Sequence, residues 1–134
     1  MPFALDNSVV TGWYLLDQSS EYTAAVAKRL EADQAIVPAI WQLELANVLK
    51  TACTRGKLTV EVARQITDTL GTLPITVDSG PAPGARQLLE LALRHQLSSY
   101  DAAYLELAMR RGVPLASQDV RLREAAIQAG VGLV

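Results

Sequence analysis

The chain is poor in the residue types on which much protein chemistry depends. Its 134 residues include one cysteine, Cys53, and one histidine, His95. A single cysteine excludes a disulfide within the chain and a metal site built from several thiolates. His95 lies near the expected end of a helix and in no recognisable nucleophile context, so we expect a structural role for it rather than a catalytic triad.

Long apolar runs and phosphate-binding glycine loops are also missing. No apolar run approaches the length that spans a bilayer, and no basic stretch followed by a long apolar one opens the chain, so we expect neither a membrane span nor a signal peptide. Residues 80–84 lack the lysine of a P-loop, and no glycine fingerprint follows the first expected strand. One free thiol fits a reducing, cytoplasmic setting.

Charge of either sign is modest. Twelve Lys and Arg stand against fourteen Asp and Glu, a formal net charge of −2, which by itself argues against nucleic-acid binding. Four of the acids lie in apolar surroundings, and without them the cations outnumber the acids. The basic residues form small groups, for which solvated helix surfaces are the simplest interpretation: Lys50, Arg55 and Lys57; Arg110 and Arg111; Arg121 and Arg123.

Short apolar runs alternate with helical patterns along the chain. This alternation, with short loops and no linker, predicts one α/β domain over residues 1–134, with a parallel sheet covered by helices. The expected strands are 3–6, 35–37, 74–77 and 113–117, with 131–134 as a candidate edge strand. The expected helices are 9–16, 20–31, 39–54, one from Thr59, 85–95, 98–111 and 121–130.

Four acids stand where acids are uncommon: Asp6, Glu44, Asp101 and Asp119. Asp6 and Asp119 follow expected strands, and Asp101 lies in the first turn of a helix. The carboxyl ends of parallel strands and the N-termini of the helices meet at one edge, so we expect these three to converge. Glu44 joins them if its helix leans over that edge. Oxygen ligands without His or Cys suit Mg²⁺ or Mn²⁺ rather than zinc.

Each acid also has a structural interpretation. Asp6 and Asp119 can cap the helices that follow them, and Asp101 can belong to a capping box begun by Ser98. Glu44 lies in the middle of a helix on an apolar face, where an arginine is an alternative partner. Four carboxylates that converge without a cation raise each other's pKa and destabilise the fold, so the combined pattern favours a metal site.

In their order and separation, four segments around these acids resemble the PIN-domain ribonucleases, and within them the VapC-type toxins. The resemblance covers nearly the whole chain. Each segment is short, and only the set of four is specific. The segments are Leu5-Asp6-Asn7-Ser8, residues 38–49 with a Glu-x-x-Asn pattern, residues 97–108 around Asp101, and residues 114–119, with Ser117 where the family usually has threonine.

The resemblance implies a three-layer α/β/α sandwich with a central, mainly parallel sheet. It also implies an endoribonuclease toxin that hydrolyses RNA with a water activated by Mg²⁺ or Mn²⁺, forms a homodimer, and is inhibited by an antitoxin protein that covers the site. By position, the implied metal ligands are Asp6, Glu44, Asp101 and Asp119, and the residues that support them are Ser8, Asn47 and Ser117.

Two questions stay open at this point. Residues 13–16, Trp-Tyr-Leu-Leu, are candidates either for antitoxin contacts or for core packing of the first helix. Functionally, a PIN nuclease of RNA processing without an antitoxin and a non-catalytic interaction module are the alternatives. The second has no support in the residues, because all four acids are present.

Overall fold

The computed structural model describes all 134 residues, and its centre is a four-stranded sheet. The strands are β1 (Phe3–Leu5), β2 (Ala35–Val37), β3 (Ile75–Val77) and β4 (Leu115–Ala116). They are ordered β3-β2-β1-β4, and every neighbouring pair is parallel. All residues of β1, β2 and β4 are buried, as expected of a parallel sheet covered on both faces.

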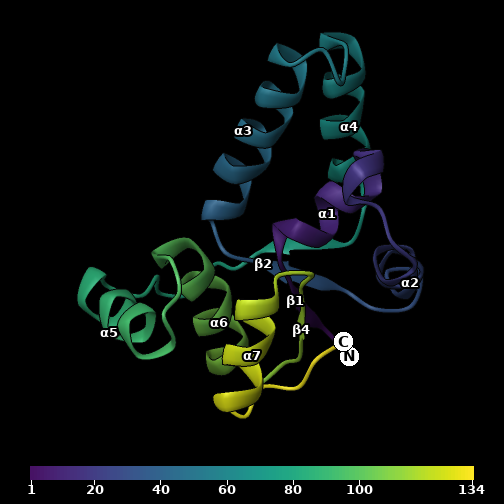
Figure 1. Ribbon diagram of the computed structural model, residues 1–134. Helices are drawn as coiled ribbons and strands as arrows, with labels where there is room; N and C mark the ends of the chain where they lie inside the picture. The colour runs from purple at the N-terminus through teal and green to yellow at the C-terminus, as the bar shows by residue number, and fades with distance from the viewer.

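Seven α-helices and one 3₁₀-helix cover this sheet in two outer layers. In Figure 1, α1, α3 and α4 lie on one side of the sheet and α5, α6 and α7 on the other, while α2 packs against α1. Right-handed crossovers produce this division, because the chain winds outward from β1 to β3 and then returns to β4 on the far side of β1. The three-layer α/β/α fold is therefore confirmed. The helices are α1 (Asn7–Tyr14), η1 (Leu16–Gln18), α2 (Glu21–Arg29), α3 (Ile40–Thr54), α4 (Val60–Thr72), α5 (Ala85–His95), α6 (Ser99–Arg111) and α7 (Val120–Gln128).

Local signals in the sequence set several helix ends. The side chains of Ser20, Thr59 and Ser98 each accept a hydrogen bond from a backbone N–H in the first turn of the helix that follows. Gly112 ends α6 with a φ of +63°, a conformation that suits glycine. None of the helices has both the length and the apolar character needed to cross a membrane.

The structure decides two expectations that the sequence left open, one about residues 131–134 and one about residues 13–16. Residues 131–134 do not form a strand, because after Gly130 only Leu133 pairs with β4, in a single parallel bridge to Leu115. Trp13 and Tyr14 are partly buried and pack against the core, whereas Leu16 is 95% exposed on η1. Core packing therefore accounts for the two aromatic residues but not for Leu16.

A cluster of ion pairs ties α6 to the end of β3. Glu106, buried on α6, accepts a hydrogen bond from Arg110 Nε at 2.9 Å. Arg110 Nη2 also donates to Asp78 Oδ2 at 2.7 Å, and Arg111 Nη1 donates to Asp78 Oδ1 at 2.8 Å. The bond from Arg110 is the main cause of the lowered pKa of Asp78. Asp78 directly follows β3, so these bonds fix the start of the β3–α5 crossover against α6.

The packing of α1 against α2 depends on a glycine in the middle of α1. A Cβ added to Gly12 would approach the backbone oxygen of Gln18 to 2.8 Å and overlap the Thr23 side chain. Thr23 is itself buried and takes part in the capping box of α2 with Ser20. The neighbouring helix therefore leaves no room for a methyl group at position 12.

We expect Gly12→Ala to lower the free energy of unfolding by about 1–3 kcal/mol, because the added methyl group overpacks the α1–α2 contact. Gly71→Ala is the matched control, since Gly71 also lies inside a helix but a Cβ there meets nothing within 4 Å. That change should raise stability by about 0.5–1 kcal/mol through helix propensity. Urea unfolding of both variants provides the measurement, and equal shifts for the two would contradict the packing argument.

Candidate active site

The site lies where β1 and β4 end side by side. The chain leaves β1 toward one layer of helices and leaves β4 toward the other, so this is the switch point at which parallel α/β sheets bind ligands. Asp6 immediately follows β1, and its backbone N–H donates to the oxygen of Ala116 at 2.9 Å. Ser117, Gln118 and Asp119 follow β4 on the adjacent strand.

Asp6 is the buried centre of this site, with only 5% of its surface exposed. Its Oδ2 accepts hydrogen bonds from the hydroxyls of Ser8 at 2.6 Å and Ser117 at 2.8 Å. Burial raises the pKa of Asp6, and the two hydroxyl bonds oppose that rise because they stabilise the charged form. Asp6 occupies the N-cap position of α1, but its side chain makes no capping bond, so the capping interpretation of this residue is wrong.

The two serines belong to a hydrogen-bonded network that joins the ends of the two strands. Ser8 Oγ accepts from the backbone N–H of Gln118 at 2.9 Å, and Ser117 Oγ accepts from that of Asp119 at 3.0 Å. The Gln118 side chain donates to the Ser8 carbonyl oxygen at 2.9 Å. Each serine hydroxyl thus accepts a hydrogen bond from a backbone N–H and donates one to Asp6, which fixes the orientation of the carboxylate.

A second group of residues supports the loop after β4 from the side of α2 and α7. The Tyr22 hydroxyl accepts a hydrogen bond from Ser117 N at 3.2 Å, and Arg123 Nη1 donates to Ser117 O at 3.0 Å. The Arg123 guanidinium lies 5.2 Å from the centre of the Tyr22 ring, within cation–π range. The sequence argument gave Tyr22 and Gln118 no role and treated Arg123 as a solvated surface residue.

Glu44 projects from α3 and is held by a tyrosine of α6. The hydroxyl of Tyr104 donates to Glu44 Oε1 at 2.6 Å, and Tyr104 is fully buried. Burial raises the pKa of Glu44, the Tyr104 bond lowers it, and the nearby charge of Asp6 raises it further. The partner of Glu44 is therefore a phenol rather than an arginine. The only sign of this hydrogen bond in the sequence is that Tyr104 lies three residues after Asp101, on the same face of the expected helix.

Asp101 and Asp119 both sit at helix N-termini that point toward this edge. The backbone N–H of Asp101 donates to Ser98 Oγ at 3.1 Å. Asp119 Oδ1 caps α7 by accepting from the N–H of Leu122 at 3.0 Å, as the structural interpretation of Asp119 predicts. One oxygen of Asp119 is thus engaged by the helix, and the other makes no hydrogen bond.

The charges of the four acids act on one another. Burial, and then the charges of Asp6, Asp119 and Glu44, raise the pKa of Asp101 to about 6. The charge of Asp119 also raises the pKa of Asp6. The four acids, Glu44 included, thus lie close enough for their charges to interact, and this repulsion disfavours the ionised form of Asp101.

Two expectations of the resemblance stay predictions: the supporting role of Asn47 and the binding of a metal ion by the four acids. Asn47 is exposed on α3 and makes no hydrogen bond to any of the four acids, so its supporting role stays a prediction. No group of three or more His, Cys, Asp or Glu side chains in the structure is arranged to hold a metal ion. The donors, all carboxylate oxygens, nonetheless match the preference of Mg²⁺ and Mn²⁺, and a cation would relieve their repulsion.

Comparison with known proteins assigns the chain to a family. The sequence model of the PIN domain matches residues 3–128, so the chain belongs to the PIN domain family. It is similar to Ribonuclease VapC1 of Mycobacterium tuberculosis, with 33% identity over 90 residues, which are 66% of this chain and 65% of that relative. The matched region thus spans slightly less than two thirds of the relative's length. The family expected from the four acidic segments is confirmed.

Solved structures share the fold at low sequence identity. PAE2754 from Pyrobaculum aerophilum superposes with a TM-score of 0.69 and 19% identity, covering 93% of this chain and 79% of that one. VapBC2 from Rickettsia felis, bound to a DNA fragment from its promoter, has a TM-score of 0.67, 12% identity and coverage of 100% and 98%. FitAcB from Neisseria gonorrhoeae has a TM-score of 0.65, 19% identity and coverage of 99% and 96%.

The raised pKa of Asp101 predicts a pH-dependent stability in the absence of divalent cations. The folded protein holds the Asp101 proton more tightly than the unfolded chain, whose carboxyl has a pKa of 3.8. This contribution is fully present below about pH 4 and is lost as the pH rises through 6. For a fully buried group, a shift of this size would lower the free energy of unfolding by about 3 kcal/mol over this pH range. Because Asp101 is only half-buried, we expect about 1 kcal/mol after solvent screening.

Asp101→Asn should therefore stabilise the protein in EDTA at pH 7.5 and flatten the decline between about pH 4 and pH 7. Asp68→Asn, at an exposed carboxylate on α4 without an ion pair, is the control for the loss of one negative charge. Chemical unfolding at several pH values provides the measurement. A decline as steep in Asp101→Asn as in the wild type would exclude Asp101 as its source.

Tyr104→Phe tests whether the phenol sets the ionisation of Glu44. Loss of the hydroxyl removes the one hydrogen bond that lowers the pKa of Glu44, so that pKa should rise further. The titration of the Glu44 side-chain carbon by NMR provides the measurement. Tyr100→Phe, on the exposed face of the same helix, should leave it unchanged. An identical titration in both variants would mean that Tyr104 has no influence on Glu44.

Proposed function

We propose that this chain is a metal-dependent endoribonuclease that acts as the toxin of a toxin–antitoxin pair. The observation that carries the proposal is that the charges of Asp6, Asp119 and Glu44 all raise the pKa of Asp101, as expected if the four carboxylates share one site. Membership of the PIN domain family and similarity to a VapC ribonuclease support the same activity.

The chemistry proposed for this site is hydrolysis of an RNA phosphodiester bond. A bound Mg²⁺ or Mn²⁺ supplies a Lewis acid for phosphate oxygens and lowers the pKa of water. The chain contributes the four carboxylates that would hold the cation. Ser8 and Ser117 fix Asp6, and Tyr104 fixes Glu44, so two of the four are oriented before any ligand arrives.

The charge of the chain is compatible with an anionic substrate once the site is considered separately. The four acids account for four of the fourteen carboxylates, and the remaining ten are fewer than the twelve lysines and arginines. A cation held by the four acids would neutralise much of the local negative charge and reduce the repulsion of an approaching phosphate. The net charge of −2 is therefore not an argument against RNA as the substrate.

For partners, we propose an antitoxin protein and a second copy of the chain. The antitoxin is supported by the fold likeness to VapBC2 and FitAcB and by the similarity to VapC1. Leu16, exposed on η1, is a candidate contact for it. The homodimer rests on the family resemblance, and the apolar side chains exposed on α5 and α6, Leu89, Leu93 and Tyr100, are compatible with it.

The test is cleavage of structured RNA by the purified chain with Mg²⁺ or Mn²⁺. We expect the wild type to cleave RNA and to lose this activity in EDTA. The rates of Asp6→Asn and Asp101→Asn should be lower by a factor on the order of 100 or more. Asp68→Asn, on α4, should cleave at the wild-type rate. Equal cleavage by all of these proteins would contradict the site assignment, and no cleavage by the wild type would contradict the activity.

Metal binding and toxicity have readouts of their own within this experiment. Mn²⁺ should raise the melting temperature of the wild type, because it binds the native state, and Glu44→Gln should reduce that rise. An unchanged response in Glu44→Gln would remove Glu44 from the metal site. Growth of cells that express the chain separates a toxin, which arrests growth, from an RNA-processing nuclease, which does not.

A further inference from the structure

A polar groove lies between α1 with η1 on one side and α3 on the other. The groove is open to solvent and has a volume of about 400 Å³. Its walls begin one helical turn beyond the site, since Thr11 follows Ser8 by three residues and Asn47 follows Glu44 by three. The groove is lined by Thr11, Leu15, Asp17, Gln18, Asn47, Val48, Thr51, Ala52, Arg55 and Lys57.

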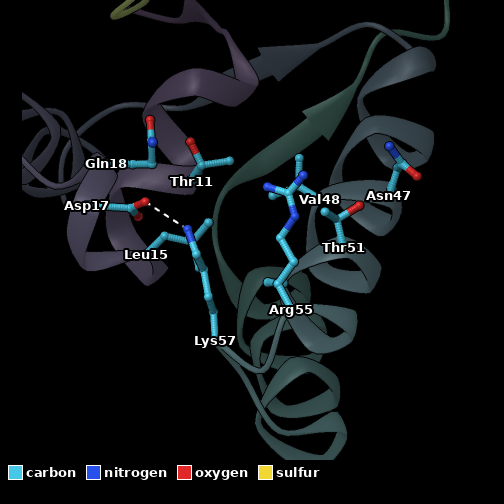
Figure 2. Close-up of a pocket in the computed structure, with 10 residues that line it drawn as sticks. Thr11, Leu15, Asp17, Gln18, Asn47, Val48, Thr51, Arg55 and Lys57 are labelled. Atoms are coloured by element: carbon cyan, nitrogen blue, oxygen red, sulfur yellow. Dashed lines mark hydrogen bonds and ion pairs between the residues drawn. The ribbon is translucent and has the colours of Figure 1, made fainter.

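The far end of this groove is basic. Figure 2 shows the Arg55 side chain extending from the end of α3 into the space between α3 and α1, where it makes no hydrogen bond or ion pair. Lys57 Nζ lies 2.9 Å from Asp17 Oδ2, and both of these side chains are about half exposed. The groove thus contains one cation without a partner and a second whose charge is largely offset by an acid.

The position of Arg55 relative to the acids fits a polymer rather than a small ligand. Arg55 lies eleven residues after Glu44, and along a continuous α-helix this separation is about 16 Å. The Arg55 side chain leans back along α3 and spans part of this distance, and the remainder still separates its guanidinium from the carboxylates. A phosphate at Arg55 would therefore be a neighbour of the phosphate at the carboxylates. Of the ten lining residues only Leu15, Val48 and Ala52 are apolar, whereas a docked protein helix needs a row of apolar anchors.

We propose that this groove binds the RNA backbone, with Arg55 contacting a phosphate near the scissile bond and Lys57 available as a second contact. Arg55 offers a planar set of donors that matches phosphate oxygens, and the unengaged side-chain groups of Thr51 and Asn47 offer neutral donors nearby. The Asp17 carboxylate competes with RNA for Lys57 and so limits affinity. The proposal rests on the ribonuclease function proposed above, because it extends the same site.

The experiment measures binding of fluorescein-labelled single-stranded RNA by anisotropy over a range of KCl concentrations, in an Asp6→Asn background that prevents cleavage. Adding Arg55→Gln should weaken binding about three- to tenfold and reduce the slope of log K against log salt by about 0.7, the loss of one phosphate contact. Arg86→Gln, at an exposed arginine on α5 outside the groove and without an ion pair, should change neither quantity.

Asp17→Asn makes a prediction of the opposite sign. Because it frees Lys57 from its only partner, RNA should bind more tightly and the salt slope should become steeper. A merely structural contribution of the Asp17–Lys57 pair would show as a lower melting temperature without this gain in affinity. Tighter binding of Asp17→Asn together with weaker binding of Arg55→Gln identifies the groove as a phosphate site.

Two results overturn the inference, and a cleavage assay separates them from failure of the ribonuclease itself. If Arg55→Gln binds RNA as the Arg86→Gln control does, the groove is no phosphate site, and weaker binding of a partner protein by that variant would assign it to that partner. The cleavage assay uses proteins that retain Asp6. If the wild type is active and Arg55→Gln has the same KM, the groove proposal is refuted and the ribonuclease proposal stands. A wild type that neither binds nor cleaves RNA refutes both proposals.

Discussion

A buried carboxylate at the junction of β1 and β4 constrains everything built around it. Asp6 has almost no contact with solvent, and desolvation raises its pKa, so its ionised form depends on the hydroxyls of Ser8 and Ser117. Those hydroxyls come from segments more than a hundred residues apart in the chain. They meet only because β1 and β4 are adjacent and parallel, so the topology of the sheet and the state of this acid are inseparable.

Helix α6 connects the site to the rest of the scaffold. Along its length it carries Asp101 at the first turn, Tyr104 against Glu44 of α3, and Glu106 in the ion-pair cluster with Arg110. That cluster continues to the end of β3 through the Asp78 carboxylate. α6 therefore contacts the sheet and, through Tyr104, the α3 helix of the opposite layer. It thereby fixes the positions of Asp101 and Glu44, which come from the two layers, relative to Asp6.

Local patterns were sufficient for the parts of the molecule that depend on neighbours in sequence. Buried strands, helix caps and the positions of acids at strand ends and helix starts were predictable because each follows from a few adjacent residues. The Tyr104–Glu44 bond was not, since it joins residues sixty positions apart and depends on how α3 leans against α6. The exposed orientation of Asn47 depends on the rotation of α3, and the lone bridge at Leu133 on how far the last residues follow β4.

The hydrogen bonds around the acids also determine how many atoms each can offer to an ion. Oδ2 of Asp6 is occupied by two hydroxyls, Oε1 of Glu44 by a phenol and Oδ1 of Asp119 by a backbone amide. Each of these carboxylates is thus held through one oxygen, and the other oxygen accepts no side-chain hydrogen bond and would be left to an incoming ion. Those remaining oxygens would be the contacts for a divalent cation, and they are hard donors of the kind that Mg²⁺ and Mn²⁺ prefer.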